Sequence, residues 1–243
     1  EKPDRVCVEL DQARFSSLTE AGSWRRLDIV DVLKNGKGFL LLANLVLSSF
    51  QRRLGAELGI SPGEEMLTAV QLCREEGIPC ELCDRDIQIT LRRAWAKSGF
   101  WGKNKMLAAM LSAVFSREKL SREEIEKLKT RTTFQSMLEE LASYLPSVKE
   151  VLIDERDLYL ATRIFRAEGK RIVAVIGAGH VEGIACNLRR LHDCTLPDDT
   201  SAIETVPQRK KAASRLLAWI IPLAIVAILA AGFFRHGRDW GYT

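Results

Sequence analysis

The chain has 243 residues and a mass of 27.3 kDa, enough for one substantial domain, or for one domain with an appendage. Its 47% hydrophobic and 28% charged residues exclude intrinsically disordered and collagen-like proteins. The net charge is +4, but residues from Gln208 onward carry +5, so residues 1–207 are close to neutral. They therefore offer no basic surface for nucleic acid, and we expect no nucleic-acid partner.

Short apolar runs alternate with helical periodicity through residues 1–207. The expected strands are 5–10, 78–83 and 171–176. The expected helices are 11–18, 39–58, 61–76, 87–97, 101–116, 121–129, 133–144, 148–168 and 181–191. Residues 196–207 are expected to form a loop or a short edge strand. Apolar strands joined by helices predict a helix-rich α/β domain around a largely parallel sheet.

Polar residues close two of the predicted strands. Glu9 ends the first strand, and a turn containing Gly177, Gly179 and His180 follows the last one. Ligand sites of open parallel sheets lie beyond the carboxyl ends of the strands, so these residues are candidates for one site. The glycines also allow a dinucleotide-binding loop, but that motif needs a third glycine where Glu182 stands. We therefore favour a site built on Glu9 and His180.

Residues 80–86 contain two patterns that occur in metal sites. Asp84 and Asp86 are either metal ligands or helix N-caps, and capping is the favoured interpretation. The Cys80-x-x-Cys83 spacing suits zinc, but a structural zinc site needs a second such pair. Reduced, packed thiols of a cytosolic domain are the favoured interpretation of the cysteines.

Glu155 is the most informative position of the helix predicted at 148–168. At about 100° per residue, it lies near the centre of an apolar stripe. The members of that stripe are Val148, Val151, Leu152, Leu158, Tyr159 and Phe165. A carboxylate in a packed interface is costly unless it meets a cation, hydrogen-bond donors or a metal. Glu155 therefore either pairs with a nearby arginine or faces a ligand site, which Arg156 at the edge of the stripe would share.

The C-terminal part of the chain is predicted to enter a membrane. Residues 216–234 carry no charge and are long enough, as a helix, to cross a hydrocarbon core of about 30 Å. The expected organisation is a domain at 1–207, a basic collar at 208–215, a transmembrane helix at 216–234 and a tail at 235–243. More basic residues precede the helix than follow it, so the positive-inside rule places the domain in the cytoplasm.

Five short sequence blocks occur in one order along the chain: 8–14, 49–55, 84–93, 155–157 and 177–184. In this order they resemble the TraB/PrgY family, the pheromone-shutdown proteins, and the basic collar and apolar tail resemble the start of its membrane region. The family is similar to the Tiki metalloproteases and the GumN proteins, which share two Gly-x-x-His motifs, a glutamate and an arginine. The resemblance covers essentially the whole chain.

The resemblance implies roles for particular residues. Gly177 to His180 matches the second Gly-x-x-His motif, Glu9 matches the glutamate and Arg156 matches the arginine. The first motif would precede Lys2, so we expect the sequence to be a fragment of a longer protein, in which further membrane helices follow. His180 and Glu9 are the expected ligands of a divalent metal ion, and Gly177 and Gly179 shape the turn at this cofactor site.

Two functions of different classes follow from these observations. The first is a membrane-tethered, metal-dependent peptidase or other hydrolase that acts on or inactivates a peptide signal, with Glu9, Glu155, Arg156 and His180 in the site. The second is a non-catalytic membrane protein that binds or sequesters a signalling peptide. The expected partners are a lipid bilayer and a peptide.

The hydrolase hypothesis makes a geometric prediction. Glu9 and His180 should lie at one edge of the sheet, with Glu155 aimed at the same crevice and Arg156 beside them, in a pocket roughly 10 Å across. If His180 instead points into the helix layer, or Glu155 is locked in a pair remote from Glu9, the catalytic hypothesis with this set of residues fails, and the domain is better interpreted as a scaffold or binding protein.

Overall fold

The computed structural model describes residues 2–19, 63–115 and 131–207, together with five single positions between 39 and 49. Residues 1–207 form one compact unit, and residues from Gln208 onward form a second unit that lies outside the described part. Most of the helix predicted at 39–58, the helix predicted at 121–129 and the predicted membrane span 216–234 also lie outside it. Within the described ranges, no helix is long and apolar enough to cross a bilayer.

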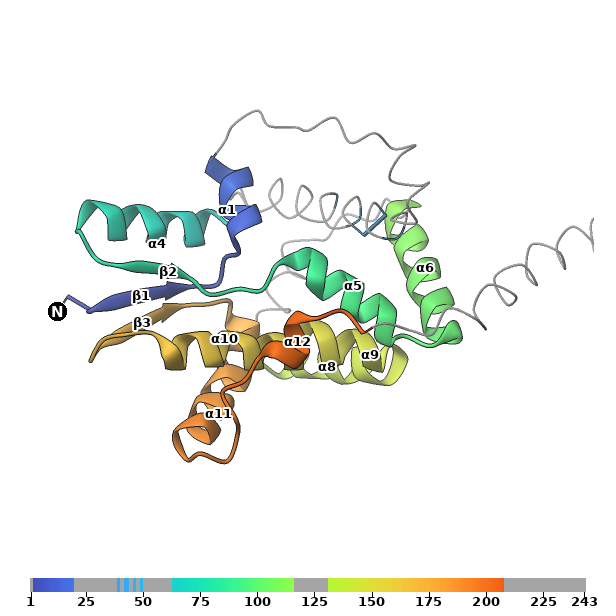
Figure 1. The fold of residues 1–243 in the computed structure, drawn as a ribbon. Helices are drawn as coiled ribbons and strands as arrows, with labels where there is room; N and C mark the ends of the chain where they lie inside the picture. The colour runs from blue at the N-terminus through green and yellow to red at the C-terminus, as the bar shows by residue number, and fades with distance from the viewer. Residues whose placement is uncertain are drawn as a thin grey trace, which may run out of the picture. The chain divides into compact units, whose positions relative to one another are not determined.

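Three parallel strands form the centre of the domain in the order β2-β1-β3 (Figure 1). They are β1 (Arg5–Val8), β2 (Cys80–Leu82) and β3 (Ile172–Val175). The register sets Val8 opposite Leu82 on one side and opposite Val175 on the other, so all three strands end at one edge. The helix-rich α/β class and the parallel sheet predicted from the sequence are thereby confirmed.

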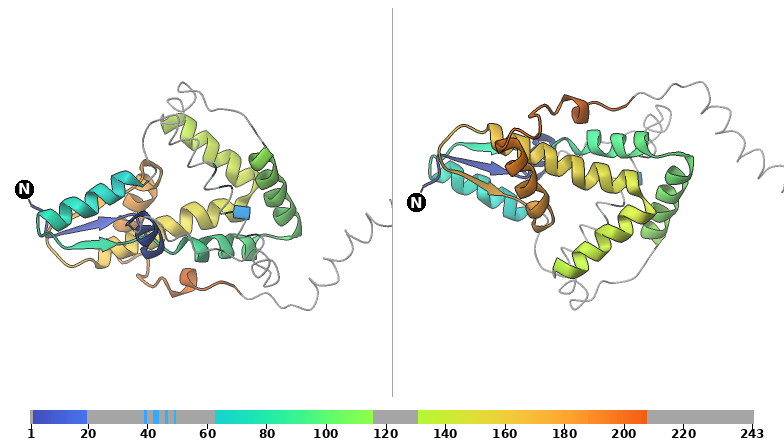
Figure 2. Two further views of the ribbon diagram at one scale, coloured as in Figure 1. Left: turned by 90° about the horizontal axis from the view of Figure 1, so that it is seen from above. Right: turned by 90° about the horizontal axis from the view of Figure 1, so that it is seen from below.

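The two faces of β1 pack against different helices, because successive strand side chains point to opposite sides. Val6 and Val8 lie in a cluster with Met66 and Val70 of α4 (Glu64–Glu75). Cys7, on the other face, lies in a cluster with residues of α10 (Glu155–Arg166) and α11 (Val181–His192). Helices therefore cover both faces of the small sheet (Figures 1 and 2).

The other helices of the described ranges agree with the predicted pattern except at the end of the domain. They are α1 (Gln12–Thr19), α5 (Ile87–Lys97), α6 (Phe100–Phe115), α8 (Arg131–Tyr144), α9 (Pro146–Lys149) and α12 (Ser201–Glu204). The interpretation of 196–207 as a loop or edge strand misses α12. Thr200 stabilises this turn, since its carbonyl oxygen accepts from Ile203 N and its hydroxyl bonds Glu204 Oε1 at 2.6 Å.

A π-helical turn, Glu150–Asp154, joins α9 to α10. A π turn holds more residues than an α turn, so a constant rotation of about 100° per residue no longer describes which side chains share a face. Leu160, outside the predicted stripe, is completely buried, whereas Phe165 inside it is 44% exposed. The predicted stripe is therefore wrong beyond the π turn, although Glu155 is buried as expected.

Asp86 caps α5, and its removal should lower stability. Its side chain accepts a hydrogen bond from Gln88 N at 2.7 Å, which confirms the capping interpretation for this residue. We expect Asp86→Ala to reduce the free energy of unfolding by about 1 kcal/mol, measured by urea denaturation. Asp198→Ala removes only an exposed pair with Arg166 and should change it by less than about 0.5 kcal/mol. Equal effects of the two substitutions would contradict the capping role.

Candidate functional site

The loops after the three strands bring polar groups to one edge of the sheet. Glu9 directly follows β1, and its N–H donates to Val175 O of β3 at 3.0 Å. Asp84 lies two residues beyond β2, and its N–H donates to Leu10 O at 3.3 Å. His180 ends a short 3₁₀ turn after β3 and is 8% exposed. The prediction that Glu9 and His180 share one sheet edge is confirmed.

The guanidinium group of Arg156, near the start of α10, connects these three loops. Its Nε lies 2.9 Å from Asp84 Oδ1, and its Nη2 lies 2.5 Å from Asp84 Oδ2 and 2.6 Å from Glu9 Oε1. Its Nη1 lies 3.2 Å from His180 Nε2. Burial alone would lower the pKa of Arg156, but the carboxylates of Asp84 and Glu9 raise it overall. The guanidinium thus stays charged at the centre of the site, as expected for a residue that flanks Glu9 and His180.

Glu9 is held from both of its oxygen atoms. Oε1 accepts from Arg156, and Oε2 accepts from the backbone N–H of Gly177 at 2.6 Å. A Cβ atom at position 177 would lie 3.2 Å from Oε2, so glycine leaves the room for this approach. In a dinucleotide loop that N–H would face a phosphate, but here it faces a carboxylate. The glycine turn therefore serves Glu9, and Gly179 lies in the 3₁₀ turn that leads to His180.

The imidazole of His180 has a different partner on each nitrogen. Nδ1 lies 2.5 Å from Asp157 Oδ1, a group that only accepts when ionised, so Nδ1 carries the proton. Nε2 faces Arg156 Nη1, which can only donate, so Nε2 presents its lone pair. Glu9 Oε1 lies 3.6 Å from the same nitrogen. The partners thus assign a neutral tautomer whose Nε2 lone pair faces the Arg156 guanidinium within the site.

The contact between Asp157 and His180 depends on Gly183 of α11. A Cβ atom at this position would lie 1.9 Å from Asp157 Oδ2, so no other residue fits while α10 and α11 keep this distance. Sequence reasoning did not assign Asp157 to the site, and it favoured a helix cap for Asp84, which instead binds Arg156. The signals that could have found them are the Glu-Arg-Asp run at 155–157 and the glycine three residues after His180.

Glu155 does not join this site, so the prediction that it points to the same crevice is wrong. Its Oε1 accepts from Arg93 Nη2 and from Lys97 Nζ, both at 2.7 Å, and its Oε2 accepts from Arg93 Nε at 2.8 Å and Arg85 Nη1 at 3.0 Å. Arg93 and Lys97 belong to α5, and Arg85 lies in the loop just before it. The alternative interpretation, a carboxylate satisfied by arginine, describes Glu155, and this outcome favours the binding hypothesis over the catalytic set of four residues.

Carboxylates outnumber cations around Arg156. The carboxylate side chains of Glu9, Asp84 and Asp157 are buried there, and Asp11 caps α1 nearby through Oδ1. Burial, and then the charge of Asp84, raises the pKa of Asp11, whose buried Oδ2 has no hydrogen-bond partner among the described residues. This excess of carboxylate oxygens favours a cation or a ligand rich in hydrogen-bond donors.

The donor types fit a divalent metal ion, but the described set is short of a complete site. His180 Nε2 and Glu9 Oε1, an imidazole nitrogen and a carboxylate oxygen of the kind that zinc and manganese bind, lie 3.6 Å apart, and both accept from the Arg156 guanidinium. Within the described ranges, no group of three His, Cys, Asp or Glu residues is placed to hold a metal. A metal bound here would therefore need a further ligand from outside those ranges.

The Cys80-x-x-Cys83 pattern does not place two thiols together. Cys83 packs beside Cys7 on the α10 face of the sheet, whereas Cys80 packs beside Cys73 of α4 on the other face. Hydrogen bonding to Cys7 and burial raise the pKa of Cys83, and burial with the neighbouring Cys73 raises that of Cys80 to about 12. All six cysteines of the chain are free thiols.

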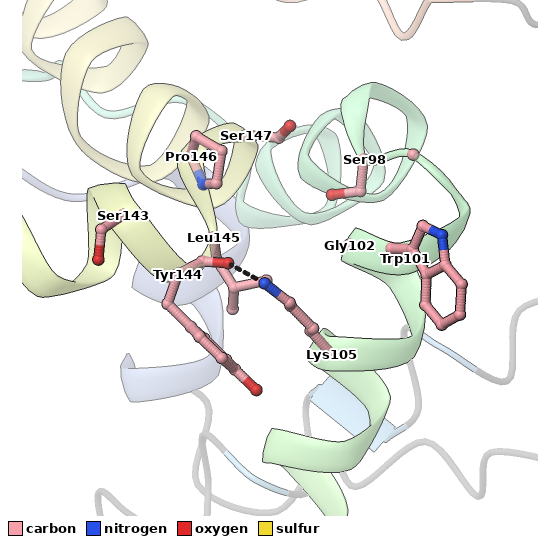
Figure 3. Close-up of a pocket in the computed structure, with 10 residues that line it drawn as sticks. Ser98, Trp101, Gly102, Lys105, Ser143, Tyr144, Leu145, Pro146 and Ser147 are labelled. Atoms are coloured by element: carbon pink, nitrogen blue, oxygen red, sulfur yellow. Dashed lines mark hydrogen bonds between the residues drawn. The ribbon is translucent and has the colours of Figure 1, made fainter.

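A cavity of about 300 Å³ lies away from this site, between the start of α6 and the turn from α8 to α9 (Figure 3). Trp101 and Lys105 line it from α6, and Tyr144 lines it from α8. Lys105 Nζ lies 3.5 Å from Tyr144 O and 4.6 Å from the centre of the Tyr144 ring, so the ammonium group already has partners within the protein. The cavity contains none of the sequence-predicted site residues.

Fold and site together define a class: a parallel α/β domain with a histidine–glutamate–arginine cluster at the carboxyl edge of its sheet. The model of the TraB/PrgY/gumN family matches residues 1–194. The chain belongs to this family, as its sequence blocks indicated. Glu9, Arg156 and His180, the residues that the resemblance singled out, are the ones that meet in the structure.

The chain is similar to proteins from distant organisms. It is 35% identical over 229 residues to an uncharacterized protein of Methanocaldococcus jannaschii, covering 93% of this chain and 56% of that protein. It is 26% identical, over an alignment 271 residues long, to a TraB domain-containing protein of Bos taurus, covering 98% of this chain and 67% of that protein. A TraB domain-containing protein of Mus musculus is 27% identical over 222 residues, covering 76% of this chain and 56% of that protein. The chain thus spans about half to two thirds of the length of these relatives.

Gly183→Ala should disrupt the site and the helix packing around it. The new methyl group would collide with the Asp157 carboxylate, so we expect the free energy of unfolding to fall by about 1–3 kcal/mol in urea denaturation. Gly99→Ala is the matched control, because a Cβ atom there meets nothing within 4 Å, and it should leave stability nearly unchanged. A Gly183→Ala protein as stable as the Gly99→Ala protein would refute the close approach of α10 and α11.

Glu155 should make stability depend on pH in the acid range. Burial alone would raise its pKa, but hydrogen bonds from Arg93, Lys97 and Arg85 lower it from 4.5 to about 2. The stabilisation is therefore complete above about pH 4.5 and is lost as the pH falls through about 2. The free energy of unfolding should fall across this window in the wild type and fall less steeply in Glu155→Gln. Asp198→Asn, at an exposed site, should keep the wild-type slope, and a wild-type slope in Glu155→Gln would contradict the ion cluster.

Proposed function

We propose that this TraB-family domain is a metal-dependent hydrolase of peptide bonds, with Glu9, Arg156 and His180 at its reacting centre. One observation carries the proposal: Asp157 holds Nδ1 of His180, so that the lone pair of Nε2 faces Glu9 and Arg156. A carboxylate behind a histidine is the usual support of a metal-binding imidazole, since it sets the tautomer and the ring orientation.

His180 Nε2 and Glu9 Oε1 would hold the metal ion, which would polarise a carbonyl group and activate a water molecule. Both residues are pre-positioned by their neighbours: Asp157 orients the imidazole, and Gly177 N with Arg156 Nη2 orients the carboxylate. The resemblance to proteins with two Gly-x-x-His motifs implies that the further ligand is a histidine of the first motif.

Arg156 is suited to bind an oxygen atom of the substrate. Its side chain is 17% exposed, and the second N–H of Nη1 has no partner among the described residues. That N–H can donate to a peptide carbonyl oxygen or to a terminal carboxylate, where developing negative charge is stabilised by the guanidinium.

This proposal does not need Glu155. Glu155 was predicted as a site residue from the apolar stripe of its helix alone. The prediction of Glu9, Arg156 and His180 rested on the family motifs as well. The ion cluster removes Glu155 from the reacting centre, and Asp84 and Asp157 become the carboxylates that position Arg156 and His180.

The second candidate is a non-catalytic protein that binds a signalling peptide. The pairing of Glu155 with α5 favours it, because this was the arrangement expected of a binding protein. The Arg156 guanidinium, already shared by Glu9 and Asp84, would then anchor a peptide carboxylate without chemistry. In either case we propose that residues 216–234 tether the domain to a membrane and that the domain faces the cytoplasm.

Metal content and peptide cleavage separate the two candidates. The full-length protein should bind a stoichiometric transition metal and cleave a labelled peptide library, and chelation should stop cleavage reversibly. We expect His180→Gln to lose metal and cleavage together, and Asp157→Asn to lower cleavage by about 10–100-fold. His192→Gln, at the exposed end of α11, should behave like the wild type. Peptide binding with neither metal nor cleavage would establish the binding protein instead.

A further inference from the structure

Two crossed ion pairs join the loop after β2 to the start of α10. Asp84 and Arg85 are consecutive in the loop, and Glu155 and Arg156 are consecutive in α10. Asp84 binds Arg156 in the candidate site, while Arg85 binds Glu155 in the neighbouring cluster. Because consecutive Cα atoms stay about 3.8 Å apart, neither pair can shift without moving the other.

The cluster around Glu155 is buried and holds more positive than negative charge. The side chains of Arg85, Arg93 and Glu155 are 1%, 4% and 7% exposed. Two guanidinium groups and Lys97 share the one carboxylate of Glu155, and within the described part of the chain only Lys97 has a second carboxylate partner, the exposed Glu150. The arginines therefore need further acceptors, since a buried cation without enough partners is strongly destabilising.

Backbone carbonyl groups of α12 supply those acceptors. Arg85 Nη1 donates to Ile203 O at 2.7 Å, and Arg93 Nη1 donates to Ala202 O at 2.9 Å and to Thr205 O. Val151 O of the π turn accepts from Arg85 Nη2 at 3.1 Å. The last described helix of the domain is thus tied to the same arginines that hold Glu155.

We propose that Glu155 and Arg85 are positioning residues, through which α12 sets the geometry of the candidate site. The α12 carbonyls hold the two arginines, the arginines hold Glu155, and the adjacent Arg156 and Asp84 then meet Glu9 and His180. A displacement of α12 reaches the site along this path. The effect on catalysis rests on the proposed function, but the coupling of α12 to His180 does not.

The imidazole of His180 reports the site geometry directly. The chain has three histidines, so ¹⁵N-histidine spectra of the full chain at fixed pH are simple, and His180→Gln assigns the signal. In the wild type we expect the neutral tautomer with the proton on Nδ1. Glu155→Gln weakens the hold on Arg93 and Arg85, so it should shift or broaden both ring signals of His180.

Lys97→Met is the matched control within the same cluster. It removes one partner of Glu155 but leaves Arg85 and its contact with α12 in place, so the His180 signals should stay as in the wild type. Signals unchanged in a folded Glu155→Gln protein, or changed equally in Lys97→Met, would overturn the positioning role.

Thr200→Val tests α12 without altering the buried charges. It removes the hydroxyl that bonds Glu204 Oε1 at 2.6 Å. The His180 signals should shift in the same direction as in Glu155→Gln, but the shift should be smaller. Unchanged signals in Thr200→Val would refute the role of α12, and this variant decides the matter if Glu155→Gln does not fold.

Kinetics provide the second readout of the positioning role. If the wild type cleaves peptide, Glu155→Gln should lower kcat about tenfold with KM nearly constant, because the reacting groups are misaligned while the peptide still binds. An equal loss of kcat in Lys97→Met would contradict the positioning role of Glu155 and Arg85. A wild type without cleavage refutes the proposed function alone, since the histidine spectra still measure the coupling.

Discussion

The Arg156 guanidinium is the interaction on which the arrangement of this domain depends. Parallel strands deliver Glu9, Asp84 and the turn before His180 to one edge, and the two carboxylates would repel each other there without a cation between them. Arg156 supplies that cation from α10, and its planar fork allows Asp84 to be bound through two nitrogens while Glu9 is bound through one of them. One side chain thereby holds the candidate site together and ties α10 to the loops after β1 and β2.

Two glycine residues make this close arrangement of side chains sterically possible. At position 177 the absence of a side chain lets Glu9 reach the backbone N–H, and at position 183 it lets Asp157 pass over α11 to His180. The Gly-x-x-His motif of the family is therefore more than a flexible turn. Its first residue holds the glutamate that lies beside the histidine, and the glycine after the motif gives the histidine its supporting carboxylate.

The fold was largely predictable because local patterns determine it. The apolar run at 171–176 and the glycine turn after it indicate a buried strand with a ligand site at its end, and β3 has this position. The helix at 87–97 is found with the predicted bounds, because Asp86 caps its start. Residues 200–205 were misassigned, since a single helical turn has no periodicity to recognise and α12 depends on contacts from Arg85 and Arg93.

By itself, the sequence determined the family, the parallel α/β class and the meeting of Glu9, Arg156 and His180, because strand ends and motifs are local features. Only the tertiary structure decided which groups the Glu155 carboxylate binds. The π turn before it ends the regular helical phase, and the arginines that bind its carboxylate lie about 60 to 70 residues away in the chain. The tertiary structure also decided which carboxylate supports which cation. Asp84 and Asp157 are ordinary acidic residues in the sequence, and they become part of the site because side chains at the start of α10 reach the loop after β2 and the turn before α11.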